Sequence, residues 1–127
     1  MGLFAIADLH LSLGVNKPMD IFKGWEHYVD RLEQNWRSKI TSEDTVVLPG
    51  DISWGMTLAQ AKPDFAFIHN LPGKKILLKG NHDYWFSTKN KVDQFLAENG
   101  FSSISMLFNN AFEYGDYCLC GTRGWMN

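Results

Sequence analysis

The sequence predicts an α/β fold built on a mostly parallel sheet, with a hairpin near its end. Short apolar runs typical of buried strands alternate with longer stretches in which apolar residues recur at steps of three and four. This alternation of strand and helix indicates parallel strands joined by right-handed helical crossovers. No repeat, low-complexity tract or linker interrupts the pattern, so we expect one domain.

The first part of the chain contains two strands and a long helix. The run 3–7 is apolar on both faces, so we expect a strand that is buried on both sides. After a loop, apolar and charged residues occupy opposite faces from Trp25 to about Lys39, which predicts an amphipathic helix; Gly24 weakens its first turn. Thr45–Leu48 is the second buried strand.

The middle of the chain repeats this order. Apolar residues at helical spacing predict a shorter helix over Leu58–Leu71, in which Pro63 marks a start or a kink. Lys75–Leu78 is the third strand. Ser87 or Thr88 can cap a further helix, and Gly100 suits the position just after its end.

The last predicted elements are strands. Ile104–Leu107 is the fourth strand, and it is followed by Ala111–Tyr114 and Tyr117–Cys120. The dipeptide Gly115-Asp116 between the last two is typical of a two-residue hairpin turn. This hairpin is expected to join the sheet and make it mixed.

Composition excludes several classes of protein. A chain of 127 residues with 45% hydrophobic residues can bury a real core, which excludes intrinsic disorder. The balance of 12 basic against 14 acidic residues argues against a broad nucleic-acid-binding face. No apolar run approaches the roughly 18 residues of a membrane span, and the N-terminus lacks a basic secretory signal, so we expect a cytoplasmic protein. The two cysteines, Cys118 and Cys120, are expected to be reduced thiols.

Polar residues follow each of the first three predicted strands at the point where it ends. They are Asp8 and His10 after the first, Asp51 after the second, and Asn81, His82 and Asp83 after the third. The carboxyl ends of parallel strands face a common crevice, so these side chains are expected to converge. Asp8 and His10 are two apart, so in extended chain both would point the same way.

The converging ligand types indicate a site for a divalent cation. Carboxylate, carboxamide and imidazole without thiolate suit Mn²⁺, Fe or Zn²⁺ better than Cu. The two oxygens of Asp51 could bridge two cations, an arrangement that assists phosphoryl displacement. Taken singly, Asp8 could instead be a turn or cap residue, and Asn81 an ordinary turn residue.

Three motifs resemble the calcineurin-like metallophosphoesterase family. Its signature of D-x-H, G-D and G-N-H-D/E is similar to Asp8-Leu9-His10, Gly50-Asp51 and Gly80-Asn81-His82-Asp83 in this chain. The neighbouring Leu-Pro-Gly-Asp-Ile-Ser-Trp and Leu-Lys-Gly-Asn-His-Asp-Tyr-Trp resemble a bacterial subgroup of predicted phosphohydrolases. The resemblance implies a four-layer α/β/β/α sandwich and hydrolysis of phosphomonoesters or phosphodiesters by a hydroxide that bridges two metal ions.

The resemblance also implies a role for each matching residue. Asp8, His10 and Asp51 would bind the first metal ion, and Asp51 and Asn81 the second. His82 would face the leaving oxygen as general acid or electrostatic stabiliser, and Asp83 would orient its imidazole. Arg123 could bind a substrate phosphate through its guanidinium, or be an ordinary surface arginine.

The family also requires histidines that this chain lacks. They are a lone His after a later strand and a G-H-x-H element, whereas no histidine follows His82 here. We therefore expect residues 1–127 to form the N-terminal half of such a domain, as a fragment, a truncated product or a degenerate relative, with weak metal occupancy and weak hydrolysis. The alternative is a non-catalytic α/β module that keeps the fold and binds a partner or a nucleotide without turnover. In either case the uncovered sheet is expected to favour self-association.

Overall fold

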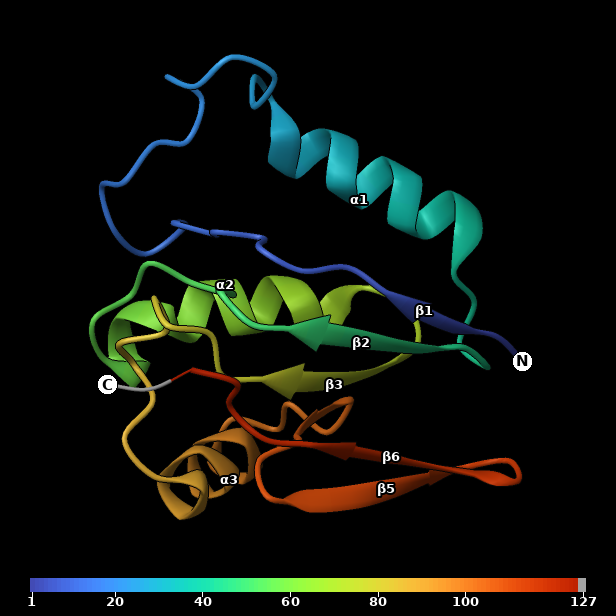
Figure 1. Ribbon diagram of the computed structural model, residues 1–127. Helices are drawn as coiled ribbons and strands as arrows, with labels where there is room; N and C mark the ends of the chain where they lie inside the picture. Colours follow the sequence, from blue (N-terminus) through green and yellow to red (C-terminus); the bar gives the residue numbers. More distant parts are fainter. Residues whose placement is uncertain (126–127) are drawn as a thin grey trace.

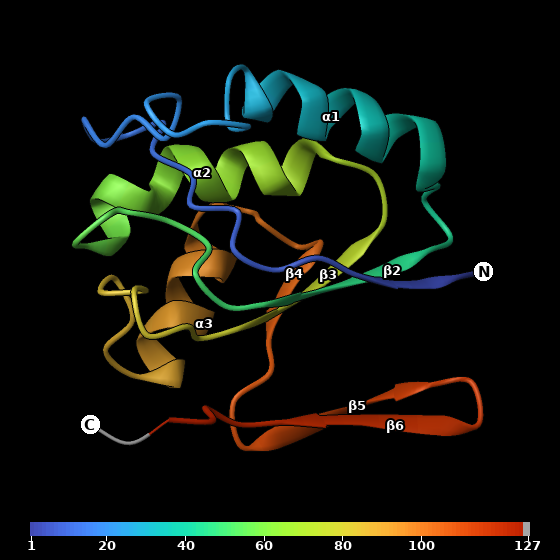
Figure 2. The same cartoon turned by 45° about the horizontal axis from the view of Figure 1, so that its top comes forward.

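Four parallel strands form the centre of the molecule, hydrogen-bonded in the order β1-β2-β3-β4; Figure 1 labels the first three, and Figure 2 also labels β4. The structure is a computed structural model that describes residues 1–125. Its elements, in chain order, are β1 (Leu3–Ala5), α1 (Tyr28–Lys39), β2 (Thr45–Pro49), α2 (Leu58–Asn70), β3 (Lys74–Leu78), α3 (Lys89–Glu98), β4 (Ile104–Met106), β5 (Asn110–Tyr114) and β6 (Tyr117–Gly121). The α/β class and the parallel sheet predicted from the sequence are confirmed.

The core lies between the sheet and its helices. Helices α1 and α2 run along one side of the sheet, and the hairpin β5–β6 lies on the other (Figure 2). Phe65 of α2 is fully buried, and its ring packs edge to face against Trp85 and against Phe95 of α3. Leu48 and Leu77 on the central strands are buried in the same cluster. Aromatic packing of this kind fixes α2 and α3 against β2 and β3.

The helix ends follow local signals in the sequence. Helix α1 begins at Tyr28, three residues after the predicted start, because the backbone of Gly24 and of His27 is left-handed, with φ of 91° and 52°. The Thr88 hydroxyl caps α3 by accepting from the backbone N–H of Lys91, and Gly100 follows that helix with φ of 69°, as predicted.

Two predictions about the strands are wrong. β1 is an exposed edge strand and not a buried one, since Leu3 and Phe4 are 44% and 39% exposed. The hairpin does not join the parallel sheet but pairs only with itself. Its side chains pack on the sheet. For example, the Lys74 ammonium on β3 lies 5.2 Å from the ring of Phe112 on β5. Within residues 1–125, no helix is both long and apolar enough to cross a bilayer.

Candidate metal centre

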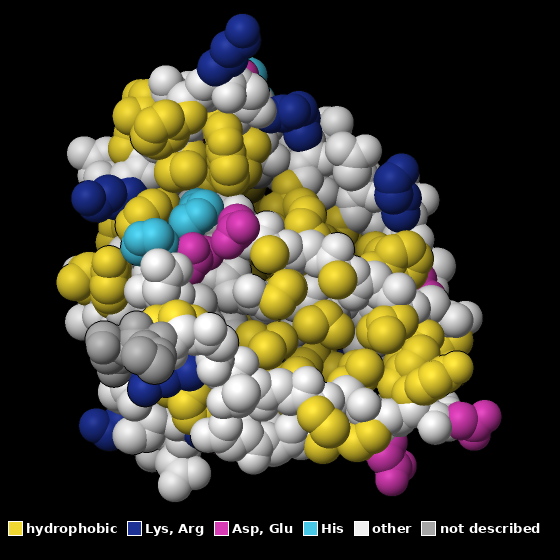
Figure 3. Space-filling model, viewed as in Figure 1, with side chains coloured by type: hydrophobic (Ala, Val, Ile, Leu, Met, Phe, Trp, Pro, Cys, Tyr) yellow, Lys and Arg dark blue, Asp and Glu magenta, His cyan; other side chains and the backbone are white. Residues whose placement is uncertain are grey.

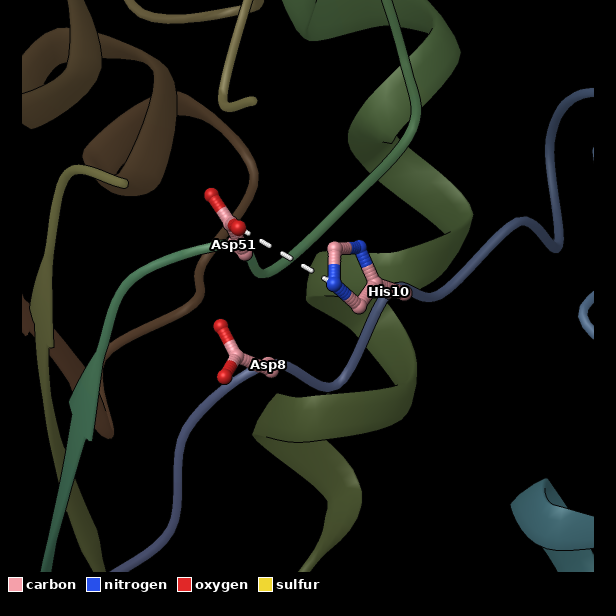
Figure 4. A group of neighbouring side chains, drawn as sticks. All are labelled: Asp8, His10 and Asp51. Atoms are coloured by element: carbon pink, nitrogen blue, oxygen red, sulfur yellow. Dashed lines mark ion pairs between the residues drawn. The ribbon is translucent and has the colours of Figure 1, made fainter. Parts of the chain in front are cut away.

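Asp8, His10 and Asp51 converge at the carboxyl end of the sheet (Figure 4). Each offers one ligand atom, and these atoms lie within 4.8 Å of one another. His10 Nε2 is 3.9 Å from Asp51 Oδ2. Figure 3 shows this His and Asp grouping at the surface beside a patch of hydrophobic side chains. Because β1 and β2 are adjacent and parallel, the segments that follow them emerge side by side.

Backbone hydrogen bonds hold these two segments together beyond the strands. The N–H of Asp8 donates to Gly50 O at 3.1 Å, and the N–H of His10 donates to Asp51 O at 2.9 Å. The sequence predicted an extended chain here, but Asp8, His10 and Asp51 all have left-handed backbones, with φ of 59°, 45° and 50°. The side chains meet through tight turns, a conformation that costs energy in non-glycine residues and is typical of functional sites.

Two glycines allow the loops after β2 and β3 to touch. A Cβ on Gly80 would lie 2.2 Å from the backbone nitrogen of Asp51, and one on Gly50 would lie 2.8 Å from the Cα of Gly80. Gly50 also has a φ of 103°. Only glycine permits this approach, which brings Asp51 next to the segment containing Asn81 and His82.

Asp51 is the most connected member of the group. Its Oδ1 accepts from the backbone N–H of His82 at 2.9 Å, and its Oδ2 lies 3.1 Å from His82 Nδ1. Burial raises the pKa of Asp51, but its hydrogen bonds with His82 and the charges of His82 and His10 outweigh burial, so the pKa lies below its ordinary value. Asp51 is therefore an ionised carboxylate at neutral pH, which can bind a cation or accept a hydrogen bond.

Asn81 lines the same cleft as Asp8 and Asp51. This cleft has a volume of about 400 Å³, and Lys79 and Trp125 also border it. The Lys79 ammonium lies 4.8 Å from the Trp125 ring and adds a positive charge beside the carboxylates of the cleft, which the sequence pattern did not indicate. Arg123 is exposed, with its guanidinium carbon 6.0 Å from that same ring.

Asp83 does not contact the imidazole of His82, which is bound by Asp51 instead. Its carboxylate is completely buried and accepts four N–H groups, from the backbones of Gly80, Ile52 and Ser53 and from the indole of Trp85. Burial raises the pKa of Asp83 more than these donors lower it. Asp83 thus ties the loop after β2 to the loop after β3.

Asp64 is a second buried carboxylate that supports the site. It lies on α2 and accepts from the backbone N–H of Leu13 at 2.8 Å and from the Ser53 hydroxyl at 2.5 Å. It therefore joins the loop after β1 to the loop after β2. The sequence pattern did not single out Asp64, although it stands three residues after Ala61 and four before Ile68, on the buried face of the helix.

Aromatic rings enclose the histidines. Trp54 stacks on His10 with ring centroids 5.1 Å apart and lies 5.5 Å from His82. The Tyr28 hydroxyl at the start of α1 donates to His10 O at 2.6 Å, and burial, followed by the charges of Asp64 and Asp20, raises the pKa of Tyr28 to about 12. The Tyr28 hydrogen bond fixes the backbone of His10, and the stacked Trp54 ring restricts the orientation of its imidazole.

The donor set fits a divalent cation. Two carboxylates and an imidazole from Asp8, His10 and Asp51, without a thiolate, are ligands for Mn²⁺, Fe or Zn²⁺. Asn81 borders the same cleft and can add an amide oxygen. Such ions take four to six ligands, so these residues leave coordination positions for water, substrate or further protein groups.

Two known proteins are similar to this chain, one in sequence and one in fold. The chain is 35% identical over 77 residues to the Gene 66 protein of Mycobacterium phage D29, an alignment that covers 61% of this chain and 38% of the phage protein. In structure it is similar to the protein of unknown function AQ665 from Aquifex aeolicus, with a TM-score of 0.52 and 22% identity, over 93% of this chain and 58% of that one. The second likeness concerns the fold alone.

The chain thus spans well under two thirds of the length of either protein. The calcineurin-like phosphoesterase family matches residues 1–124, which is nearly the whole chain. With Asp8-Leu9-His10, Gly50-Asp51 and Gly80-Asn81-His82-Asp83 meeting at one end of its parallel sheet, this chain belongs to the calcineurin-like phosphoesterase family.

Proposed function

We propose that this chain belongs to a metal-dependent enzyme that hydrolyses phosphomonoesters or phosphodiesters. The observation that carries the proposal is the meeting of Asp8, His10 and Asp51 ligand atoms within 4.8 Å, in a chain that matches this family. Asp8, His10 and Asp51 would hold one cation, and Asp51 and Asn81 a second. When bound, such cations lower the pKa of a coordinated water and neutralise charge on the phosphoryl oxygens.

His82 is the proposed proton donor or electrostatic stabiliser for the leaving oxygen. Asp51 is ionised and can only accept, so its contact with His82 Nδ1 requires the proton on that nitrogen. Nε2 is then the atom that gains or releases a proton during a reaction. The His82 side chain is 41% exposed, which allows a substrate to reach it.

We also propose that residues outside this chain complete the metal centre, so that residues 1–127 form part of a larger domain. The family resemblance calls for more histidines, and both similar proteins are longer than the region that aligns. We expect the chain alone to bind metal weakly and to hydrolyse substrate slowly, because each absent ligand removes coordination energy.

Two further proposals concern the surroundings of the protein. The exposed apolar side chains Leu3, Phe4 and Ile6 on and after the edge strand β1 support self-association through this uncovered part of the sheet. Size-exclusion chromatography checks it: Phe4→Ser should shift the chain toward the monomer, and a monomeric unaltered chain would contradict it.

Cys118 and Cys120 are exposed free thiols, which supports a reducing compartment such as the cytoplasm.

Calorimetric titration with Mn²⁺ tests the metal site directly. Asp8 is exposed, so Asp8→Asn removes a ligand charge while leaving the core intact. We expect this variant to bind Mn²⁺ about tenfold more weakly or worse. The matched control is Asp116→Asn in the exposed hairpin turn, which should bind like the unaltered chain.

Equal Mn²⁺ affinity of Asp8→Asn and the unaltered chain would overturn the metal site. Hydrolysis of 4-nitrophenyl phosphate with and without Mn²⁺ tests the rest of the proposal. Fast Mn²⁺-dependent turnover would contradict an incomplete centre. If a version extended with the missing histidine elements binds Mn²⁺ but hydrolyses no phosphate ester, the chain is instead a non-catalytic metal-binding module.

A further inference from the structure

A second pocket lies beside the candidate metal centre and shares Trp54 with it. The pocket has a volume of about 280 Å³, enough for one small ring system and less than a whole drug-sized ligand needs. We call it the Trp54 pocket, and the residues that define it here are Lys17, Pro18, Met19, Ile21, Phe22 and Trp54. It is formed by the loop between β1 and α1 together with the segment after β2.

Apart from Lys17 and Asn16, the lining of the Trp54 pocket is apolar, and the pocket is open to solvent. Ile21 and Phe22 are 76% and 52% exposed, an unusual position for two large apolar side chains in succession. Figure 3 shows hydrophobic side chains gathered directly beside the histidines. Exposed apolar groups next to a candidate active site indicate contact with an apolar part of a ligand.

Trp54 links the pocket to the metal centre. Its ring stacks on His10, and the Lys17 ammonium lies 5.9 Å from the same ring. The indole N–H of Trp54 is buried and, within residues 1–125, has no hydrogen-bond partner. Buried donors are nearly always paired in folded proteins, so the Trp54 ring keeps hydrogen-bonding capacity that its protein neighbours do not use.

We propose that the Trp54 pocket binds a flat aromatic ring of the phosphate ester, either a nucleobase or a phenyl ring. This inference rests on the proposed function, since the phosphate of that ester would lie at Asp8, His10 and Asp51. A planar ring is stabilised by stacking on aromatic side chains such as Phe22 and Trp54. The ammonium of Lys17 provides positive charge for a phosphate or for the ring face.

Binding of adenosine in the presence of EDTA tests the pocket by itself, because this probe has no phosphate and the buffer no free metal. Equilibrium dialysis measures its dissociation constant for the unaltered chain, and ribose is the control ligand. We expect Phe22→Ala to weaken adenosine binding about tenfold. The control variant Tyr117→Ala removes an aromatic ring on the hairpin that is more exposed, 76% against 52% for Phe22, and should change nothing.

A second ring probe, 4-nitrophenol, distinguishes the two sources of the ring. Binding of adenosine alone assigns the pocket to a nucleobase, and binding of 4-nitrophenol alone assigns it to a phenyl ester. The proposal is overturned if neither binds more tightly than ribose, or if Phe22→Ala binds both as well as the unaltered chain. It is also overturned if Phe22→Ala converts a dimer into a monomer, because the pocket is then an interface between copies.

Failure of this inference and failure of the proposed function give different results. Adenosine binding that Phe22→Ala weakens, in a chain that binds no Mn²⁺, would overturn the metal centre and leave the ring site. Mn²⁺-dependent hydrolysis of adenosine 5′-monophosphate and ribose 5-phosphate at equal rates, with no adenosine binding, would overturn only the ring site. Circular dichroism of Phe22→Ala checks that the variant is folded.

Discussion

Replacement of Asp83 with alanine is expected to destabilise the fold strongly, although the residue lies in a loop. Its carboxylate accepts four N–H groups and is completely buried. A buried donor left without a partner costs about 1–3 kcal/mol. Water that enters the space left by the carboxylate can pair with some of these donors, so we expect a loss of about 3–5 kcal/mol in the free energy of unfolding.

Urea denaturation followed by tryptophan fluorescence measures this loss. With a slope of about 2 kcal/mol per molar urea, the midpoint should fall by roughly 1.5–2.5 M. Asp83→Asn keeps one acceptor oxygen and should lie between the alanine variant and the unaltered chain. Asp116→Ala removes an exposed carboxylate from the hairpin turn and should change stability by less than about 0.5 kcal/mol. A loss below about 1 kcal/mol for Asp83→Ala would refute the role of Asp83 in joining the two loops.

Two further predictions concern buried and close-packed positions. Burial lowers the pKa of Lys75 to about 8 from 10.5, so the unfolded chain binds more protons between those values and stability should rise with pH there. Between pH 8 and pH 10, the free energy of unfolding of the unaltered chain, measured by urea titration, should rise by about 2 kcal/mol relative to that of Lys75→Met. A difference between the two chains that stays constant with pH would contradict this. Gly80→Ala should lower the thermal midpoint of unfolding sharply, because the added Cβ would meet the Asp51 backbone. The control Gly124→Ala should not lower it, because among the described residues no atom beyond its chain neighbours lies within 4 Å of the added Cβ. Similar midpoints for both variants would show that the loops have room to separate.

Much of the fold follows from local patterns in the sequence. The strand–helix alternation predicted the parallel sheet, and Thr88 and Gly100 marked the ends of α3 because caps and left-handed residues are local signals. The exposure of β1 could not be predicted in this way. The same apolar sequence can form a strand that another layer covers or one that is left exposed. Whether a strand lies at the edge of a sheet depends on the topology of the whole chain.

The candidate site was predictable to the extent that strand direction determines it. Asp8, His10 and Asp51 meet because parallel neighbouring strands deliver them to the same edge. The hydrogen-bond partners of the Asp83 carboxylate were not predictable from the sequence. They depend on which of several buried N–H groups in an irregular turn lies closest to it. The contact of Trp54 with His10 joins loops after different strands, so no spacing in the sequence encodes it.

The left-handed backbones of Asp8, His10 and Asp51 limit which substitutions give interpretable results. Alanine tolerates a positive φ less well than aspartate, asparagine or histidine, so an alanine scan would remove a ligand and distort the turn in one step. Asparagine keeps both the shape and the backbone preference of the aspartates. Substitution with asparagine therefore separates the loss of metal coordination from distortion of the turn. A mutant library at these positions should be restricted to residues that tolerate a positive φ.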